Sequence, residues 1–307
     1  MKVVLAGGSG SLGRRIGADL VERGDEVVIL SRSPRPGGPH RQVTWDGATV
    51  GPWAAELPGA ALINLAGALV DRRPTPANID LLTKSRVEPT KALAEAVTTL
   101  DRPPTVWLQM STLAIYGDAG DAVLDETARP ADGPAQMAGV ARAWESSASG
   151  INACRQVVLR SGIVFAPGTP AFDRLAGLTR WGLGGRIGSG RQWISWLHVQ
   201  DFLGIVRRVL DDASLSGVTH ATSPNPVRNA ELMATLRSVF NRPTAPPTPA
   251  WLLRMGAIVL RSDPALALTG RRGIPTRLLD AGFVFSHPEL GDAPVASERQ
   301  SADYASA

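Results

Sequence analysis

Three glycines near the N-terminus constrain the fold of this chain more than any other feature. Gly7, Gly10 and Gly13 lie in the stretch VVLAGGSGSLGRRIGADL, where a strand-like run passes directly into a helix-like one. Glycines there allow a tight turn and let the backbone approach a pyrophosphate, while the N-terminus of the helix presents N–H donors to the anion. The stretch predicts a dinucleotide-binding turn that also includes Ser11 and Leu12; a purely structural turn is the alternative.

The segments that follow predict an α/β fold with a Rossmann-type, doubly wound parallel sheet. Strand-like runs alternate with helix-like ones up to about residue 165, and the runs that we assign to strands are KVVLAG, EVVIL, ALINLAG, TVWLQMS and RQVVLRSGIVF. Beyond that point the alternation ends, and a stretch rich in glycine and tryptophan is followed by shorter elements. We therefore predict a nucleotide-binding domain over 1–165 and a smaller C-terminal α/β substrate domain over 166–291, parts of which return to the first lobe. Residues 292–307 are expected to form a flexible tail.

The composition is typical of a soluble globular protein. The chain has 307 residues, of which 44% are hydrophobic and 20% charged, enough for one large core or two lobes that share a cleft. Its longest apolar runs are strand-sized, well short of the ~20 residues that span a bilayer. Because the N-terminus leads directly into a strand, we expect no signal peptide, no membrane partner and a cytoplasmic location.

The net charge, the cysteine count and the histidine spacing argue against nucleic-acid binding, disulfides and metal sites. The formal net charge is only +4 and no basic block occurs, so we expect no nucleic-acid partner. The single cysteine, Cys154, excludes an internal disulfide. His40, His220 and His287 lack the spacing of metal ligands, so no metal site is predicted.

The end of the second strand-like run predicts which dinucleotide is bound. An acidic residue there would hydrogen-bond the ribose 2′-hydroxyl of NAD, but the sequence has Ser31 and Arg32. Arginine can form a charge-assisted pair with a 2′-phosphate and serine can add a hydroxyl. We therefore expect NADP(H) rather than NAD; the alternative is that Arg32 is only a solvated loop charge.

Several longer motifs resemble the extended short-chain dehydrogenase/reductases, and more narrowly an atypical branch of their epimerase family. The broader resemblance rests on GxxGxxG, NLAG at 64–67, STLAIYG at 111–117 and LHVQD at 197–201. The narrower one rests on WD at 45–46, KSRVEPTKAL, WE at 144–145, GLGGRIGSGRQWISWLHVQD and PTRLLDAGFVFSHPEL. The resemblance extends over nearly the whole chain and implies bound NADP(H) and an activity that is mostly unassigned even within the branch.

Carried over residue by residue, the resemblance implies a cofactor site and an incomplete catalytic set. Asn64, Ala66, Gly67 and Arg86 would line the cofactor, and Thr112 corresponds to the catalytic Ser/Thr that polarises a substrate carbonyl. The usual tyrosine and lysine fall on Ala138 and Arg142. Arginine can still hold the nicotinamide ribose, but alanine can donate no proton.

Tyr116 is the candidate that replaces the missing proton donor. It follows Thr112 in the YG motif, and we expect Arg142 and the positively charged nicotinamide to lower the pKa of its phenol. The alternatives are that Tyr116 packs at the rim of the pocket and that water supplies the proton.

The segment 182–196 is expected to form one wall of a substrate cleft. It combines many glycines with Trp193 and Trp196, so Gly188 and both indoles are candidate substrate contacts, although core packing of the rings is nearly as plausible. His198 and Asp201 could be acid–base groups, but we expect them to be architectural.

Two functions remain open. The first is an NADP(H)-dependent oxidoreductase or epimerase-like enzyme that acts on a small carbonyl or hydroxyl substrate, as a possible homodimer. The second is a non-catalytic NADP(H)-binding redox sensor or scaffold that has lost the proton donor.

Overall fold

A parallel sheet of seven strands forms the centre of the protein, as seen in a computed structural model that describes residues 1–35, 37–259 and 261–291. Each strand is parallel to its neighbours, and the spatial order is β11 (Gly217–Ala221), β7 (Gln156–Ser161), β5 (Val106–Thr112), β4 (Ala61–Asn64), β1 (Lys2–Ala6), β2 (Glu26–Ser31) and β3 (Arg41–Thr44). The strand order reverses between β1 and β4. Open α/β sheets bind ligands at such a switch point, outside the carboxyl ends of the strands.

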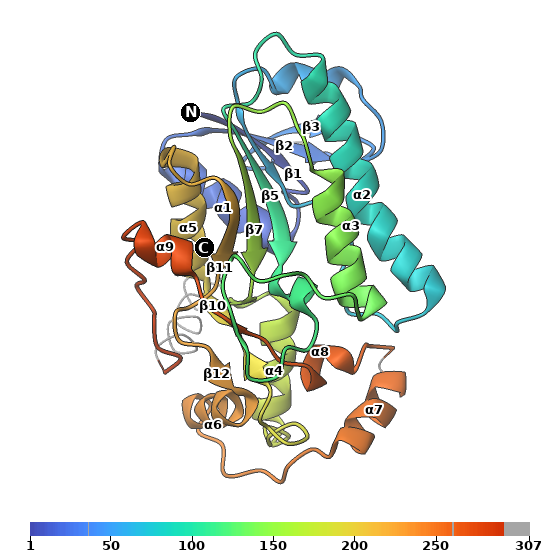
Figure 1. The fold of residues 1–307 in the computed structure, drawn as a ribbon, viewed down its shortest axis with the longest axis vertical. Helices are drawn as coiled ribbons and strands as arrows, with labels where there is room; N and C mark the ends of the chain where they lie inside the picture. The colour runs from blue at the N-terminus through green and yellow to red at the C-terminus, as the bar shows by residue number, and fades with distance from the viewer. Residues whose placement is uncertain (36, 260, 292–307) are drawn as a thin grey trace.

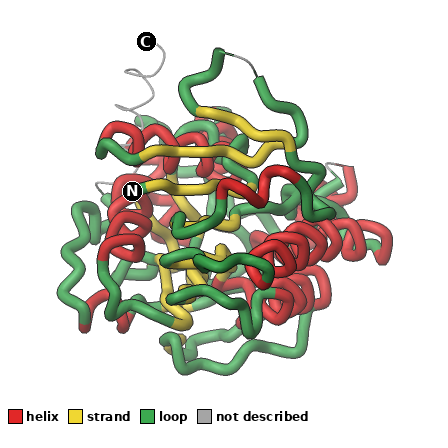
Figure 2. The backbone as a smooth tube through the Cα atoms, turned by 90° about the horizontal axis from the view of Figure 1, so that it is seen from above, coloured by secondary structure: helices red, strands yellow, loops and turns green. Residues whose placement is uncertain are grey.

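Helices cover both faces of this sheet, which confirms the predicted doubly wound fold (Figures 1 and 2). α1 (Ser11–Glu22) and α5 (Val199–Asp211) lie on one face, and α2 (Pro76–Thr98) and α3 (Val140–Ser147) lie on the other. Alternate residues of each strand enter the two cores, because side chains alternate across a sheet. Leu5 packs in one core with Ile16 of α1, whereas Val4 packs in the other with Leu93 of α2.

The run predicted as one long strand, RQVVLRSGIVF, is two strands. β7 ends at Ser161, and β8 (Ile163–Phe165) leaves the main sheet to pair with β10 (Trp196–His198). Gly162 stands at the break, and a Cβ there would lie 2.6 Å from the carbonyl oxygen of Ser195. The chain can therefore turn away only because this residue has no side chain.

A second lobe lies beyond the carboxyl ends of the strands (Figure 1). Its core gathers Phe165, Phe172, Trp196 and Leu232. The lobe is built mainly from α4 (Pro170–Arg180), β9 (Trp193–Ile194), β12 (Val227–Arg228), α6 (Asn229–Val239), α7 (Ala250–Val259) and α8 (Ala265–Leu268). The chain returns to the first lobe in α5 and β11, so the two lobes exchange segments.

The remaining elements are short. They are η1 (Pro52–Glu56), η2 (Leu113–Tyr116), β6 (Val123–Leu124), η3 (Ala135–Gly139), β13 (Arg272–Gly273) and α9 (Thr276–Asp280). The tail expected over 292–307 lies outside the described residues. Among the helices of the described ranges, none is long and apolar enough to cross a bilayer.

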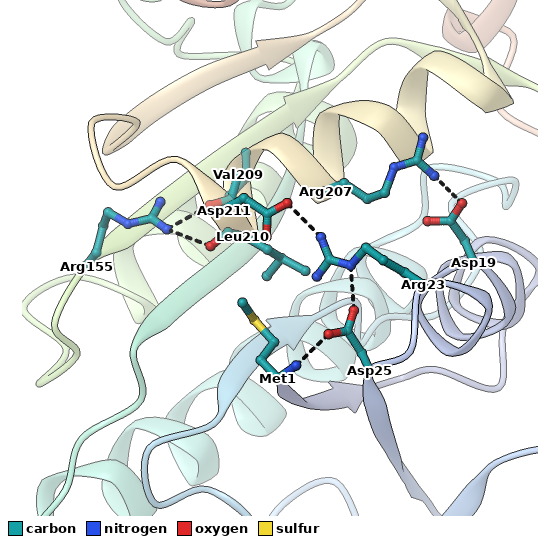
Figure 3. A network of polar contacts seen from close by, with 9 residues as sticks. All are labelled: Met1, Asp19, Arg23, Asp25, Arg155, Arg207, Val209, Leu210 and Asp211. Atoms are coloured by element: carbon teal, nitrogen blue, oxygen red, sulfur yellow. Dashed lines mark hydrogen bonds and ion pairs between the residues drawn. The ribbon is translucent and has the colours of Figure 1, made fainter.

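A polar network ties α1 to α5 at the edge of the sheet opposite the second lobe (Figure 3). Arg23 donates to Asp25 and to Asp211 at 2.6 and 2.7 Å, and the amino group of Met1 donates to Asp25 at 2.6 Å. Arg207 of α5 pairs with Asp19 of α1. These contacts fix the relative position of the two helices on one face of the sheet.

Candidate functional site

The glycine turn between β1 and α1 has the geometry that a phosphate-binding turn requires. Gly7 has a φ of +78°, a conformation that L side chains rarely adopt. A Cβ on Gly13 would lie 2.6 Å from the backbone of Gly8, so α1 can approach the turn only with glycine there. Gly10 is the N-cap of α1 and provides no side-chain cap. The first turn of α1, which contains Ser11 and Leu12, therefore keeps its N–H groups available to an anion.

Ser31 and Arg32 lie at the same edge of the sheet, where β2 ends. Ser31 is buried and its Oγ accepts a hydrogen bond from the N–H of Ser33 at 3.2 Å. The Arg32 side chain is exposed, and no carboxylate within the described ranges forms an ion pair with it. The Arg32 guanidinium is thus free to bind an anion beside the glycine turn.

The chain after β4 packs directly on the glycine turn. A Cβ on Gly7 would lie 2.9 Å from the backbone of Ala66, so the two turns are in close contact. Asn64 is fully buried; its Oδ1 accepts from the N–H of Ala66 at 3.1 Å, and its amide donates to Thr90 and Gln109. The Asn64 side chain therefore shapes the turn at Ala66 and is not itself exposed to a ligand.

Arg86 of α2 brings a buried positive charge to this turn. A Cβ on Gly67 would lie 3.0 Å from Cζ of Arg86, whose guanidinium donates to the carbonyl of Ala68 at 2.9 Å and lies over the Trp144 ring at 5.1 Å. Arg86 is 9% exposed, and no carboxylate of the described chain pairs with it. Burial lowers the pKa of Arg86 to about 10. A buried cation without a counter-ion is costly, so an anionic ligand at Gly67 would stabilise it.

Thr112 stands at the carboxyl end of β5 and keeps its hydroxyl hydrogen available. Its Oγ1 accepts from the N–H of Ala114 at 3.1 Å, which caps η2. Ser161 pairs with Thr112 in the parallel ladder between β5 and β7, so the two hydroxyl residues are neighbours about 4.8 Å apart on one face. Sequence reasoning missed Ser161, because only the register between two separate strands brings it beside Thr112.

The structure corrects the expectation for the helix that carries Ala138 and Arg142. η3 is a π-type turn that continues directly into α3, where the sequence pattern predicted regular α-helical spacing. Ala138 is fully buried. Arg142 forms a 3.1 Å ion pair with the exposed Asp132, which leaves its guanidinium at the surface. The predicted contact between Arg142 and Tyr116 is therefore wrong, while the predicted contact of Arg142 with the nicotinamide ribose stays a prediction.

A different arginine, Arg160 of β7, contacts Tyr116. It donates to the Tyr116 hydroxyl at 2.6 Å and forms a two-pronged ion pair with Glu145. Tyr116 is only 4% exposed, and burial raises the pKa of its phenol despite the opposing effect of Arg160. The expectation of a lowered Tyr116 pKa is wrong. Tyr116 is a buried, protonated phenol rather than an accessible proton donor.

The segment 182–196 packs within its own lobe. Trp196 is fully buried and stacks on Phe165, so its predicted role as a substrate contact is wrong. Trp193 is half-buried between the guanidinium groups of Arg228 and Arg272, whose Cζ atoms lie 3.9 and 4.5 Å from the ring centroid.

Gly188 belongs to the same packed segment. It has a φ of +56° and faces Leu268 and Ala250. These contacts hold the segment against residues 246–250 and 267–270, and its predicted role as a wall of the substrate cleft stays a prediction.

His198 and Asp201 are architectural, as predicted. Nδ1 of His198 caps α5 by accepting from Gln200, and burial lowers the pKa of His198 to about 3. Asp201 is buried and accepts from the N–H groups of Ser286 and His287 at 2.6 and 3.0 Å. In the described part of the chain, no group of three His, Cys, Asp or Glu side chains could hold a metal ion.

Comparisons with known proteins agree with this geometry. The sequence model of the NAD dependent epimerase/dehydratase family matches residues 3–220, and a domain of unknown function, DUF1731, matches residues 248–293. Human epimerase family protein SDR39U1 is 34% identical over 95% of this chain and 98% of its own length. Bacillus subtilis epimerase family protein YfhF is 29% identical over 94% of this chain and 95% of its own length.

Solved structures give the same relationship. The crystal structure of human SDR39U1 with NADPH matches with a TM-score of 0.86 and 33% identity, and the match covers 97% of this chain and 99% of that one. A nucleoside-diphosphate sugar epimerase from Corynebacterium glutamicum matches with a TM-score of 0.75 and 30% identity, over 95% of this chain and 57% of that one. The chain therefore belongs to the NAD dependent epimerase/dehydratase family.

Proposed function

We propose that this protein binds NADP(H) at the carboxyl edge of the sheet and acts as an oxidoreductase or epimerase-like enzyme on a small carbonyl or hydroxyl compound. One observation carries the proposal: the glycine turn, the turn at Ala66 and Gly67, and the unpaired buried Arg86 are in direct contact. This arrangement supplies close backbone approach, helix N–H donors and a cation in one place. The human relative, whose crystal structure was determined with NADPH, supports this choice of cofactor.

Each part of the site has a separate binding role. The first turn of α1 would hold the pyrophosphate, and Arg32 at the end of β2 would pair with the 2′-phosphate that distinguishes NADP(H) from NAD. Arg86 would compensate negative charge near Gly67. The bound nicotinamide supplies or accepts a hydride.

Thr112 is the residue that would contact the reacting oxygen of the substrate. Its hydroxyl accepts from Ala114 and can donate to a substrate oxygen, while the hydroxyl of neighbouring Ser161 donates to the carbonyl of Gly162 at 2.8 Å and offers its oxygen as an acceptor. Reduction of a carbonyl requires a proton at that oxygen, supplied directly or through one water. Because the Tyr116 hydroxyl is buried and engaged and the Ser161 hydrogen is donated to Gly162, Thr112 with a bound water is the better route.

A second candidate function is a non-catalytic NADP(H)-binding sensor or scaffold. It is favoured by the fully buried Ala138 at the position of the usual tyrosine and by the surface ion pair of Arg142. The two candidates share the cofactor site and differ only in turnover. Incubation of the purified protein and NADPH with a broad panel of carbonyl compounds separates them, because only an enzyme would oxidise NADPH at a rate that depends on the compound.

Gly10→Ala tests the shared cofactor site without disturbing the fold. A Cβ at Gly10 meets nothing closer than 3.6 Å, so the variant should fold, but its methyl group would occupy the space that a phosphate needs. We expect NADPH affinity, measured by quenching of tryptophan fluorescence, to fall about tenfold or more.

The matched control is Gly177→Ala in α4, where the added methyl group has open space around it. It should bind NADPH like the wild type. Unchanged affinity in a folded Gly10→Ala variant would show that the glycine turn is only structural.

A further inference from the structure

Helix α7 presents large apolar side chains to solvent along one face. Five of its ten residues are exposed and apolar, and only Ala257 is buried. The exposed side chains and their exposed fractions are Trp251 (62%), Leu252 (47%), Met255 (59%), Ile258 (61%) and Val259 (81%). An exposed helix of a soluble domain normally carries polar residues on its outer face, and contiguous apolar surface of this kind marks an interaction site.

The surroundings of this apolar surface are basic. The helix and its flanking residues, 249–262, contain no aspartate or glutamate, while they carry Arg254 and Arg261. Arg254 lies on α7 itself and is exposed, and Arg261 follows the helix and is also exposed. Arg73 of the first lobe donates to the carbonyl of Ile258 and brings another positive charge to the end of the helix.

The acidic residues near α7 do not offset this charge. Asp71 is engaged by Arg174 and by Ser262, and Asp263 is buried with its Oδ1 accepting from the N–H of Ala265. The surface that an incoming partner meets at α7 is therefore apolar at its centre and positively charged at its margins.

We propose that α7 docks this protein onto the surface of a bilayer that contains anionic phospholipids. Apolar side chains with a tryptophan among them enter the boundary between headgroups and acyl chains, while arginines meet lipid phosphates. A helix of ten residues is about 15 Å long, so it would lie in the interface and not cross the membrane. This proposal revises the expectation of no membrane partner, which considered spanning segments and signal peptides only.

The charge pattern disfavours two other occupants. A second copy of the chain related by a two-fold axis would place this basic margin against its own copy, and like charges would repel. Nucleic acid would be attracted by the arginines but offers little to Leu252, Ile258 and Val259, whose apolar side chains would face phosphates.

The test uses the full chain and vesicles of defined composition. Vesicles of phosphatidylcholine with about 30% phosphatidylglycerol are compared with vesicles of phosphatidylcholine alone in a cosedimentation assay. We expect the wild type to partition onto the anionic vesicles, with binding weakened at about 0.5 M NaCl because salt screens the arginines. Trp251→Ser combined with Val259→Ser should weaken partitioning about tenfold or more.

Val284→Ser is the matched control, because Val284 is an 85% exposed apolar residue outside α7. It should leave vesicle binding unchanged, and NADPH binding should be the same in all variants because α7 lies apart from the glycine turn in the chain and the fold. The proposal is overturned if the wild type does not bind the anionic vesicles, binds both compositions equally, or binds them as well after the α7 substitutions. It is also overturned if light scattering shows that these substitutions dissolve a dimer while vesicle binding is absent.

Discussion

The Tyr116 hydroxyl donates its hydrogen to Nε2 of His220, 2.7 Å away. The direction of this bond follows from the other side of the ring: Nδ1 of His220 lies 3.0 Å from the carbonyl of Ile274, which can only accept, so Nδ1 carries the hydrogen and Nε2 is the acceptor. Arg160 meanwhile donates to the Tyr116 oxygen. The bonds join η2, β7, β11 and the segment after β13, and they make Tyr116 part of the framework below the site.

Tyr116→Phe should therefore lower the free energy of unfolding and have little effect on the rate of the chemical step. The substitution leaves Nε2 of His220 and one N–H of Arg160 buried without a partner, which costs about 1–3 kcal/mol in the free energy of unfolding. Urea unfolding measures this loss, and NADPH affinity should be unchanged. If turnover instead fell about a hundredfold while stability was retained, Tyr116 would be the proton donor after all.

Stability should fall between neutral pH and about pH 4. Burial lowers the pKa of His220 from 6.5 to about 4, so between these values the unfolded chain binds a proton that the native protein does not. The stabilisation by neutral His220 is thus complete above pH 6.5 and is lost as the pH falls toward 4, by up to about 3 kcal/mol.

The variant His220→Gln isolates this contribution. Glutamine can still accept from Tyr116 but does not titrate, so the variant should lose less stability than the wild type between pH 7 and about 4.5. Parallel curves of unfolding free energy against pH for the two proteins would assign the pH dependence to other groups, such as His198.

Thr112→Val should abolish turnover while the protein still binds NADPH. Valine is nearly isosteric but has no hydroxyl to place at a substrate oxygen, so we expect the chemical step to slow by about a hundredfold or more in single-turnover measurements. Ser161→Ala is the companion variant: a smaller loss would make Ser161 a helper, and an equal loss would make the two hydroxyls a functional pair. Full activity of Thr112→Val would move the proton transfer elsewhere.

Arg32→Ala should remove the preference for NADPH over NADH. A charge-assisted hydrogen bond to the 2′-phosphate contributes about 1.5–3 kcal/mol, which corresponds to roughly tenfold to hundredfold in affinity. Titration of both cofactors into wild type and variant measures the ratio, and NADH affinity should stay constant because NADH lacks that phosphate. Equal affinities of the wild type for both cofactors would refute the role of Arg32.

The sequence by itself determined the fold class and the place of the cofactor turn. Both follow from local chemistry. Gly7 is required by its positive φ, and Gly13 is required because it packs closely on Gly8, only a few residues away. The alternation of strands and helices is also visible in short stretches of sequence, because a strand that is buried on both faces forms a continuous apolar run.

Only the tertiary structure decided which side chains meet at the site. Strand register rather than sequence distance places Ser161 beside Thr112. Tyr116 meets Arg160 and His220, which lie 44 and 104 residues away in the sequence. Burial of that cluster sets the pKa of Tyr116, and no local pattern encodes burial that arises from the packing of distant strands.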